Sequence, residues 1–286
     1  PTRTPRPRRT PSPRGVTATS PGVVETGESF EAVVFDYGLT LVGFERPLEA
    51  IDRAQRAIAD LIRAGGHDRP SEACLRDEVY GRIEAEVSAH EASQVLEEID
   101  IADVERRAFA AIGLDLDAAL LDGCSRLIQE AWFHGVRLYD DVVPALTLLR
   151  ERGVRIALCS NAAYRPASLH AQLANAGLDR LLDAVVFSSE VRWRKPSPRI
   201  FEAALTALHA SAARSLFVGD RLREDVSGAQ AVGMRAVLID RSETTSSAAT
   251  ARSDASARPL AVIRTLADLP ALVGTATMLR NDGRRI

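Results

Sequence analysis

The sequence predicts an α/β protein in which a doubly wound parallel sheet of five strands carries an inserted all-helical domain. Two patterns predict this fold. Beyond residue 139, short apolar runs alternate strictly with helical patterns, which is the order expected of a parallel sheet with helical crossovers. Before that region, about ninety residues of helical periodicity separate the first apolar run from the second, and this is far longer than an ordinary crossover.

The chain begins with a segment whose composition opposes folding. Residues 1–28 are rich in proline, arginine, serine and threonine, with five arginines and no acidic residue before Glu25. Such a segment lacks the apolar pattern needed to pack against a core. We therefore expect residues 1–28 to form a disordered arm.

The first strand is a short apolar run that ends on a carboxylate. Ala32–Phe35 is continuously apolar, and Asp36 follows it, with small, turn-forming residues after it. Ligands of open α/β sheets bind beyond the carboxyl ends of the strands. Asp36 is therefore either placed for chemistry or is an ordinary turn residue, and the later motifs decide between these readings.

Residues 45–135 carry four apolar stripes with helical spacing. Gly65 and Gly66 follow the first stripe, and Gly113 follows the third. The stripes run over 48–62, 75–87, 104–112 and 120–131. They predict a helical cap domain over 45–135, inserted into a core domain made of 29–44 and 136–275.

The rest of the core alternates between strands and helices. Gly153 and Gly233 end two of the predicted helices, while Ser197 and Pro198 begin another. Strands are predicted at 154–159, 184–187, 215–218 and 235–239, and helices at 141–152, 165–176, 197–208, from Asp220 to Val232, and near 266–273. Residues 242–256 read as a loop, and 276–286 as a frayed tail.

The composition is that of an ordinary globular protein. Of the 286 residues, 46% are hydrophobic, the formal net charge is −3, and no apolar run is long enough to span a membrane. The three cysteines, Cys74, Cys124 and Cys159, are widely spaced, which favours free thiols in a reducing compartment. We therefore expect a cytoplasmic protein, monomer or homodimer, without a nucleic-acid or membrane partner.

Polar residues stand at three strand ends, where a parallel sheet brings its carboxyl termini together. Asp36, Ser160 and Asp220 each follow an apolar run, and Lys195 lies on the loop after a fourth. Two carboxylates, an ammonium and a hydroxyl are the groups that hold a divalent cation and a phosphate. Asp225 falls in the first turn of the next helix, where it either caps that helix or orients a metal-bound water.

Lysine usage points to the same place. The chain has 36 lysines and arginines, and Lys195 is the only lysine. A compact ammonium suits a narrow anionic site better than a planar guanidinium does. Arg192 and Arg194 flank Trp193 just before it, and they form either a basic approach for an anionic substrate or a solvated loop.

Four motifs in order resemble those of the haloacid dehalogenase-like (HAD) superfamily. They are Asp36 with Thr40-Leu41, Cys159-Ser160-Asn161, Lys195-Pro196, and Gly219-Asp220 with Asp225. The resemblance covers about residues 31–273, and the helical insertion after the first motif is similar to the cap of subfamily I. It implies a Rossmann-like core and a hydrolase of phosphoric monoesters.

The resemblance also implies a mechanism and a set of site residues. Asp36 would attack phosphorus and form an aspartyl phosphate, while Lys195 would neutralise the charge of Asp36 and the phosphate. The cofactor would be Mg²⁺. The implied metal-binding residues are Asp36, Gly38, Asp220 and Asp225, and the implied phosphate-binding residues are Ser160, Asn161, Thr40 and Lys195.

The first motif departs from the family pattern at Gly38. Phosphatases of the family usually carry a second aspartate there, which protonates the leaving group and later activates water, and glycine can do neither. Some phosphatase-like members with glycine at this position resemble this chain in keeping the metal site. We expect a phosphatase of a small phosphorylated metabolite that is slow, depends on a good leaving group or uses an acid of the cap. The alternatives are a non-catalytic binding or regulatory module, and a hydrolytic 2-haloacid dehalogenase, which the retained Asp220 disfavours.

Overall fold

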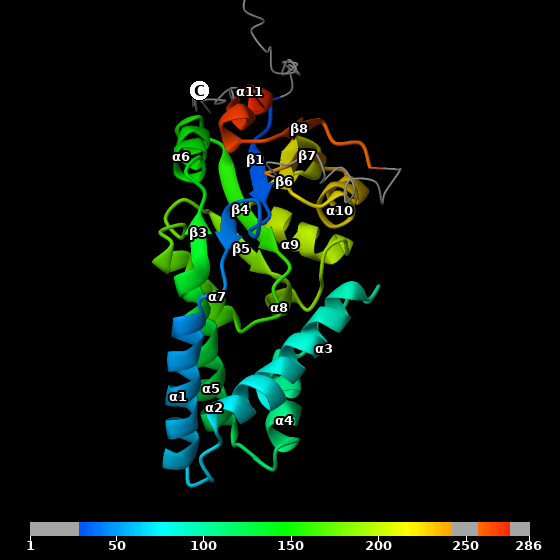
Figure 1. Ribbon diagram of the computed structural model, residues 1–286. Helices are drawn as coiled ribbons and strands as arrows, with labels where there is room; N and C mark the ends of the chain where they lie inside the picture. The colour runs from blue at the N-terminus through cyan, green and yellow to red at the C-terminus, as the bar shows by residue number, and fades with distance from the viewer. Residues whose placement is uncertain (1–28, 242–256, 275–286) are drawn as a thin grey trace, which may run out of the picture.

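The computed structural model describes residues 29–241 and 257–274. The predicted arm (1–28), the predicted loop (242–256) and the predicted tail (276–286) lie outside these residues. Figure 1 shows a sheet region above a bundle of helices. Within the described ranges, no helix combines the length and the apolar character that a membrane span requires.

The central sheet is parallel and doubly wound, as predicted. From β1 the chain moves outward through β4 and β5, and then returns to the other side of β1 through β6, β7 and β8. Every neighbouring pair is parallel. The strands are β1 (Ala32–Phe35), β4 (Arg155–Ser160), β5 (Ala184–Phe187), β6 (Ser215–Gly219), β7 (Arg235–Ile239) and β8 (Ala261–Ile263).

Within residues 29–241 and 257–274 the sheet has six strands, so the predicted number of five is wrong. The additional strand, β8, is only three residues long and pairs in parallel with β7, with Ala261 opposite Val237. A run of three residues shows no measurable alternation, and only the hydrogen bonds to β7 make it a strand. The sequence pattern alone therefore predicted no element for this segment.

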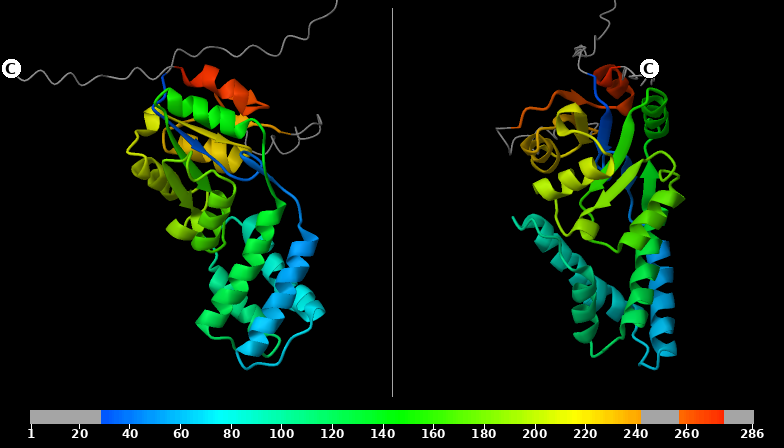
Figure 2. Two further views of the ribbon diagram at one scale, coloured as in Figure 1. Left: turned by 90° about the vertical axis from the view of Figure 1, so that its left-hand side faces the viewer. Right: turned by 180° about the vertical axis from the view of Figure 1, so that it is seen from behind.

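Helices cover both faces of the sheet (Figure 2). Val33 and Phe35 of β1 point to one face and Ala32 and Val34 to the other, because side chains alternate along a strand. One face packs on α6 (Val142–Glu151), α7 (Pro166–Asn175) and α11 (Leu269–Val273), and the other on α9 (Pro198–Ala207) and α10 (Gly228–Ala231). The strands are apolar on both faces for this reason.

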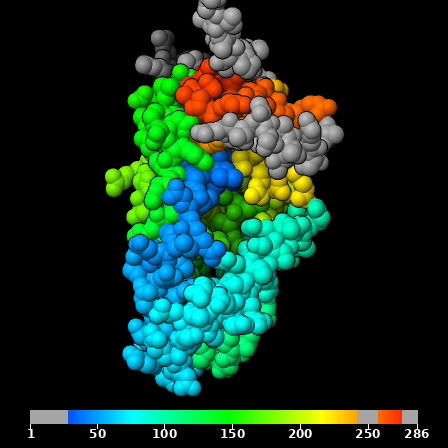
Figure 3. Space-filling view, in the orientation of Figure 1, coloured from blue at the N-terminus to red at the C-terminus, as the bar shows by residue number. Residues whose placement is uncertain are grey.

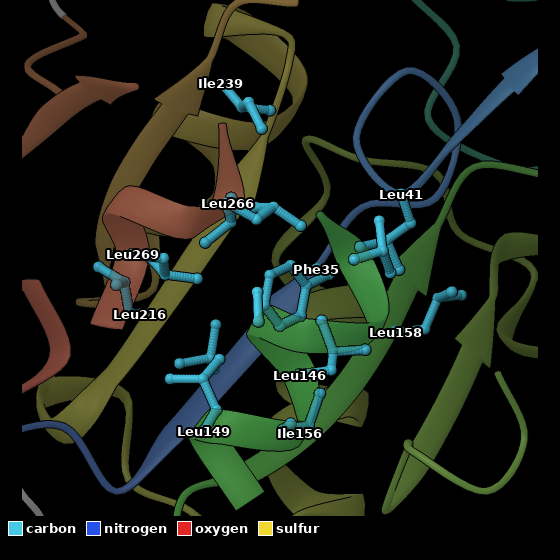
Figure 4. Packing of buried hydrophobic residues seen from close by; sticks show 14 of the residues in the cluster. Phe35, Leu41, Leu146, Leu149, Ile156, Leu158, Leu216, Ile239, Leu266 and Leu269 are labelled. Atoms are coloured by element: carbon cyan, nitrogen blue, oxygen red, sulfur yellow. The ribbon is translucent and has the colours of Figure 1, made fainter. Parts of the chain in front are cut away.

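The first of these faces is closed by large side chains. Figure 4 shows Phe35 surrounded by side chains of α6 and of the neighbouring strands, among them Leu146, Leu149 and Ile156. The Phe35 side chain is fully buried. This packing anchors the strand at whose carboxyl end Asp36 lies.

Residues 45–135, the helical insertion, contain the helices that the apolar stripes predicted. Helices α1 and α5 pack along one another, and the buried side chains form a hydrophobic cluster separate from those of the sheet. The predicted domain limits remain a prediction that this separate cluster supports. The elements are α1 (Leu48–Ala64), α2 (Glu72–Cys74), a π-helical stretch (Leu75–Tyr80), α3 (Gly81–Ala92), α4 (Ile101–Ala110), α5 (Ala118–Ala131) and a 3₁₀ turn (Trp132–Gly135).

Two short strands that the sequence analysis did not predict join the insertion to the sheet region. β2 (Val42–Phe44) and β3 (Val136–Leu138) pair antiparallel, so both connecting segments run side by side. The Glu45 N–H extends this pairing by donating to the Gly135 carbonyl at 2.8 Å. The connection is therefore a hydrogen-bonded ribbon and not two independent linkers.

We predict that Gly135→Ala lowers the free energy of unfolding by at least about 2 kcal/mol. A Cβ at Gly135 would lie 1.9 Å from the Glu45 carbonyl oxygen, so the backbone of the ribbon would have to shift. Urea denaturation measures the change. Gly81→Ala is the matched control, because its Cβ would meet only the Arg76 carbonyl at 3.4 Å and alanine favours the helix. Equal stability of the two variants would contradict the prediction.

Candidate active site

The carboxyl ends of β1, β4 and β6 meet at a cavity of about 410 Å³. Asp36 follows β1, Ser160 ends β4, and Asp220 follows β6. Figure 3 looks toward the opening between the sheet region and the helical insertion. Of the residues predicted for the site, the cavity is lined by Asp36, Gly38, Ser160, Asn161, Lys195 and Asp225.

The ammonium group of Lys195 contacts two carboxylates of the site. Its Nζ lies 2.6 Å from Asp36 Oδ1 and 2.6 Å from Asp225 Oδ1, and its side chain is 2% exposed. Burial by itself would lower the pKa of the Lys195 ammonium, but the charges of Asp225 and Asp36 raise it above its ordinary value. Lys195 is therefore a permanent cation between two carboxylates.

Asn161 positions the backbone of Lys195. The Asn161 Oδ1 accepts a hydrogen bond from the Lys195 N–H at 2.7 Å, and the Asn161 Nδ2 donates to the Lys195 carbonyl at 3.2 Å. Both polar atoms of this amide thus hold the loop that carries the ammonium. Asn161 also lines the cavity, and its direct contact with a phosphate stays a prediction.

Asp225 lies at the start of a π-helical stretch, Leu222–Ser227. Its Oδ2 accepts from the Arg221 N–H at 2.9 Å, which is the capping role, while its Oδ1 binds Lys195. A Cβ at Gly219 would lie 2.3 Å from Asp225 Oδ2, so only glycine at the end of β6 leaves room for this carboxylate. Burial raises the pKa of Asp225 to about 6, against the opposing charge of Lys195.

Three carboxylates converge beside Lys195. One oxygen from each of Asp36, Asp220 and Asp225 lies within 4.8 Å of the others. Burial, followed by the charges of Asp36 and Asp225, raises the pKa of Asp220 to about 7. Oxygen donors gathered with unrelieved negative charge fit a hard divalent cation, and Mg²⁺ is the ion that such donors hold beside a phosphate.

Thr40 is placed differently from the other predicted residues. Its side chain is fully buried, and its Oγ1 has no hydrogen-bond partner among the described residues. It is not part of the cavity lining, whereas its carbonyl accepts from Arg241 Nε at 3.0 Å. In this structure Thr40 connects the loop after β1 to Arg241 through its carbonyl. Its predicted contact with a phosphate stays untested.

The two arginines before Lys195 differ, because Arg192 is exposed and Arg194 is not. Arg194 is buried and donates to Glu98 of the helical insertion at 3.0 Å, and Ser188 donates to the same carboxylate. The Arg194 N–H also donates to the Leu96 carbonyl at 2.7 Å. These bonds attach the helical insertion to the sheet region directly beside Lys195. Sequence spacing gave no signal of the partner, Glu98.

The helical insertion also supplies part of the cavity wall. Glu91, Gln129, Trp132 and Phe133 line the cavity from this side. The first three, together with Tyr164, also line a second cavity of about 250 Å³ between the cap helices. Sequence analysis missed Glu91, Gln129 and Trp132, because helical periodicity does not show which residue at the end of a helix faces a neighbouring domain.

Comparison with known proteins places the chain among hydrolases. The sequence model of haloacid dehalogenase-like hydrolases matches residues 30–233. The chain is 31% identical over 212 residues to a glyceraldehyde 3-phosphate phosphatase of Methanopyrus kandleri, covering 74% of this chain and 84% of that protein. It is 37% identical over 120 residues to a phosphoserine phosphatase of Thermus thermophilus, which spans 41% of this chain and 47% of that one.

Solved structures show the same fold. A HAD phosphatase from Thermococcus onnurineus superposes with a TM-score of 0.56 at 25% identity, covering 86% of this chain and 98% of that chain. An L-2-haloacid dehalogenase from Xanthobacter autotrophicus superposes with a TM-score of 0.53 at 25% identity, covering 86% and 100%. The fold is thus common to proteins of both kinds, and the site residues must distinguish between them.

We predict that Asp220→Asn raises the thermal stability of the metal-free protein, by about 2–4 °C for each kcal/mol of relieved repulsion. The folded-state pKa of about 7 lies above the ordinary value of 3.8. Between these values the folded protein keeps a proton that the unfolded chain releases, so ionisation costs stability as the pH rises. The advantage of the variant should therefore grow from pH 4 to 7 and stay constant above.

Thermal unfolding in EDTA at pH 5 and pH 8 measures this difference. Asp52→Asn, an exposed substitution on α1, is the control and should behave like wild type at both pH values. A lower melting temperature of Asp220→Asn than of wild type at pH 8 would contradict the prediction that the ionised Asp220 destabilises the metal-free protein.

Proposed function

Since this chain belongs to the haloacid dehalogenase-like hydrolase family, we propose that it is a Mg²⁺-dependent phosphatase of a small phosphorylated metabolite that reacts through an aspartyl phosphate. The observation that carries the proposal is the contact of the Lys195 ammonium with Asp36 and Asp225, beside Asp220. The similarity to phosphatases of glyceraldehyde 3-phosphate and phosphoserine supports it.

Asp36 is the best placed nucleophile. It lines the cavity, and its Oδ1 is held by Lys195, whereas Oδ2 accepts no hydrogen bond from the described residues. Asp225 is 1% exposed, and both of its oxygens are occupied by Lys195 and the Arg221 N–H. The free oxygen of Asp36 therefore attacks phosphorus, and Asp225 keeps Lys195 in position.

Two groups of the chain bind the phosphoryl oxygens. The Ser160 side chain lines the cavity at the end of β4 and makes no hydrogen bond with any described residue, so its hydroxyl is available to a ligand. Lys195 reduces the repulsion between the anionic nucleophile and the anionic phosphate, which is the main obstacle to this reaction. A negatively charged ester is thereby held against Asp36.

The carboxylates of Asp36, Asp220 and Asp225, and the carbonyl of Gly38, would hold Mg²⁺. When bound, the ion supplies further positive charge next to the transferred phosphoryl group. Among the described residues, no lysine or arginine side chain lies within hydrogen-bond distance of the Asp220 carboxylate. This supports a role in binding the ion. A metal-independent dehalogenase would have no use for this third carboxylate.

The test is hydrolysis of 4-nitrophenyl phosphate, whose leaving group needs no protonation by the enzyme. We expect turnover with Mg²⁺ and its loss in EDTA, and we expect Asp36→Asn to reduce kcat at least about 10³-fold. Asp52→Asn serves as the control with unchanged activity. Absence of turnover by the folded wild type would instead favour a binding module, and EDTA-insensitive release of halide from a 2-haloacid would favour a dehalogenase.

We further predict that Lys195→Arg does not preserve activity, and that kcat/KM falls at least about 10²-fold. The Nζ lies between two carboxylates at 2.6 Å and 5.2 Å from the centre of the Phe217 ring, with its side chain almost fully buried. A planar guanidinium is too broad for this space. Steady-state kinetics measure the loss, with thermal unfolding as the check on folding. Wild-type kinetics of the variant would contradict the requirement for a compact cation.

A further inference from the structure

The aromatic ring of Phe44 lies against Gly38, the position at which the family pattern has an acidic residue. A Cβ at Gly38 would lie 2.9 Å from Cε2 of Phe44, the last residue of β2. Phe44 packs edge-on against Tyr37, with ring centroids 6.1 Å apart. The space beside the nucleophile that a carboxyl group would need is thus bounded by an apolar ring.

The next residue of the loop is held in an unfavourable backbone conformation. Leu39 has φ of 58°, in the left-handed region that favours glycine. Its side chain is 48% exposed and lines the same cavity. A strained leucine that presents its side chain at a functional site is a candidate for direct contact with a ligand.

Large apolar side chains make up much of the cavity lining. Of the large hydrophobic side chains that are exposed in the described ranges, Leu39, Phe44 and Tyr164 all line this cavity. Its aromatic and leucine side chains come from the first loop, from β2, from the helical insertion and from the loop after β4. They are Tyr37, Leu39, Phe44, Trp132, Phe133 and Tyr164, and Leu169 of α7 adds a further leucine.

The carboxyl groups that line the cavity outside the charged cluster are already paired. Glu91 lies 3.8 Å from Arg194, and Glu224 lies 3.5 Å from Arg223. Neither is presented as an unpaired acid over Asp36. With Gly38 in place of an acidic residue, the loop after β1 supplies no carboxyl group that could protonate the leaving group.

We propose that the physiological leaving group is aromatic, so that the substrate is an aryl phosphate whose ring lies against Phe44, Leu39 and the aromatic side chains of the cap. This inference rests on the proposed phosphatase activity. A phenol has a pKa of about 10, whereas an aliphatic alcohol resembles water, at about 16. An aryl oxide therefore leaves without protonation by an acid at position 38. Its ring can pack against the apolar side chains of the cavity.

The reaction balances with groups already named. Oδ2 of Asp36 forms a bond to phosphorus, and the bond between phosphorus and the aryl oxygen breaks. The aryl oxide takes the bonding electron pair and acquires its proton from water after release. Water then cleaves the aspartyl phosphate, which yields inorganic phosphate and restores the carboxylate.

The first experiment compares phenyl phosphate and 2-naphthyl phosphate with ethyl phosphate and glycerol 3-phosphate, all with Mg²⁺. We expect kcat/KM for the aryl esters to exceed that for the alkyl esters at least about 10²-fold. Equal or better hydrolysis of the alkyl esters would overturn the inference. If 4-nitrophenyl phosphate itself is not hydrolysed, the proposed function fails instead, so the two failures are distinguishable.

The second experiment separates contact with the ring from the acidity of the leaving group. Acetyl phosphate has a good leaving group without a ring. Phe44→Ala should reduce kcat/KM for phenyl phosphate about 10-fold and leave that for acetyl phosphate unchanged, and Phe44→Tyr should retain wild-type kinetics. Phe44 is half exposed, so folding should persist, and thermal unfolding checks this. Val143→Ala, at an exposed site on α6, is the control.

An equal loss on both substrates would show that Phe44 has only a structural role and would overturn the contact. Wild-type kinetics of Phe44→Ala on phenyl phosphate would overturn it as well.

Discussion

The burial of one ammonium between two carboxylates is the interaction on which this site depends. Asp36 precedes β6 in the sequence and Asp225 follows it, and Lys195 Nζ lies 2.6 Å from one oxygen of each. Without it, two buried carboxylates would face each other beside Asp220, and their repulsion would have no compensation within the protein. The surrounding structure serves this contact: Asn161 holds the Lys195 backbone, and Gly219 leaves space for Asp225.

The same arrangement supports the proposal that the site binds a cation and, with it, an anionic substrate. Lys195 neutralises part of the charge, while burial and the charges of Asp36 and Asp225 raise the pKa of Asp220, against the opposing charges of Arg221 and Lys195. In the proposed function, a divalent ion would complete the compensation of charge and allow the cluster to accept a phosphate. The cavity thus combines this charged cluster with the apolar side chains of its lining.

The helical insertion contributes through its attachment as much as through its helices. The β2–β3 ribbon carries Phe44 to Gly38, and the buried pair of Arg194 and Glu98 fastens the insertion next to Lys195. The side chains that we propose to contact the leaving group therefore come from segments far apart in the sequence. A change in the position of the insertion would alter the apolar wall and the loop of Lys195 together.

The sequence by itself determined the alternation of strands and helices, the helical insertion, and the residues at the strand ends, because these features depend on periodicity and on neighbours along the chain. It did not reveal β8, the β2–β3 ribbon or the partner of Arg194, since short pairings and buried ion pairs have no local signal. Only the tertiary structure brought Lys195 to Asp36 across 159 positions and placed Phe44 over Gly38. Distances of this kind follow from how the elements pack, which no single stretch of sequence specifies.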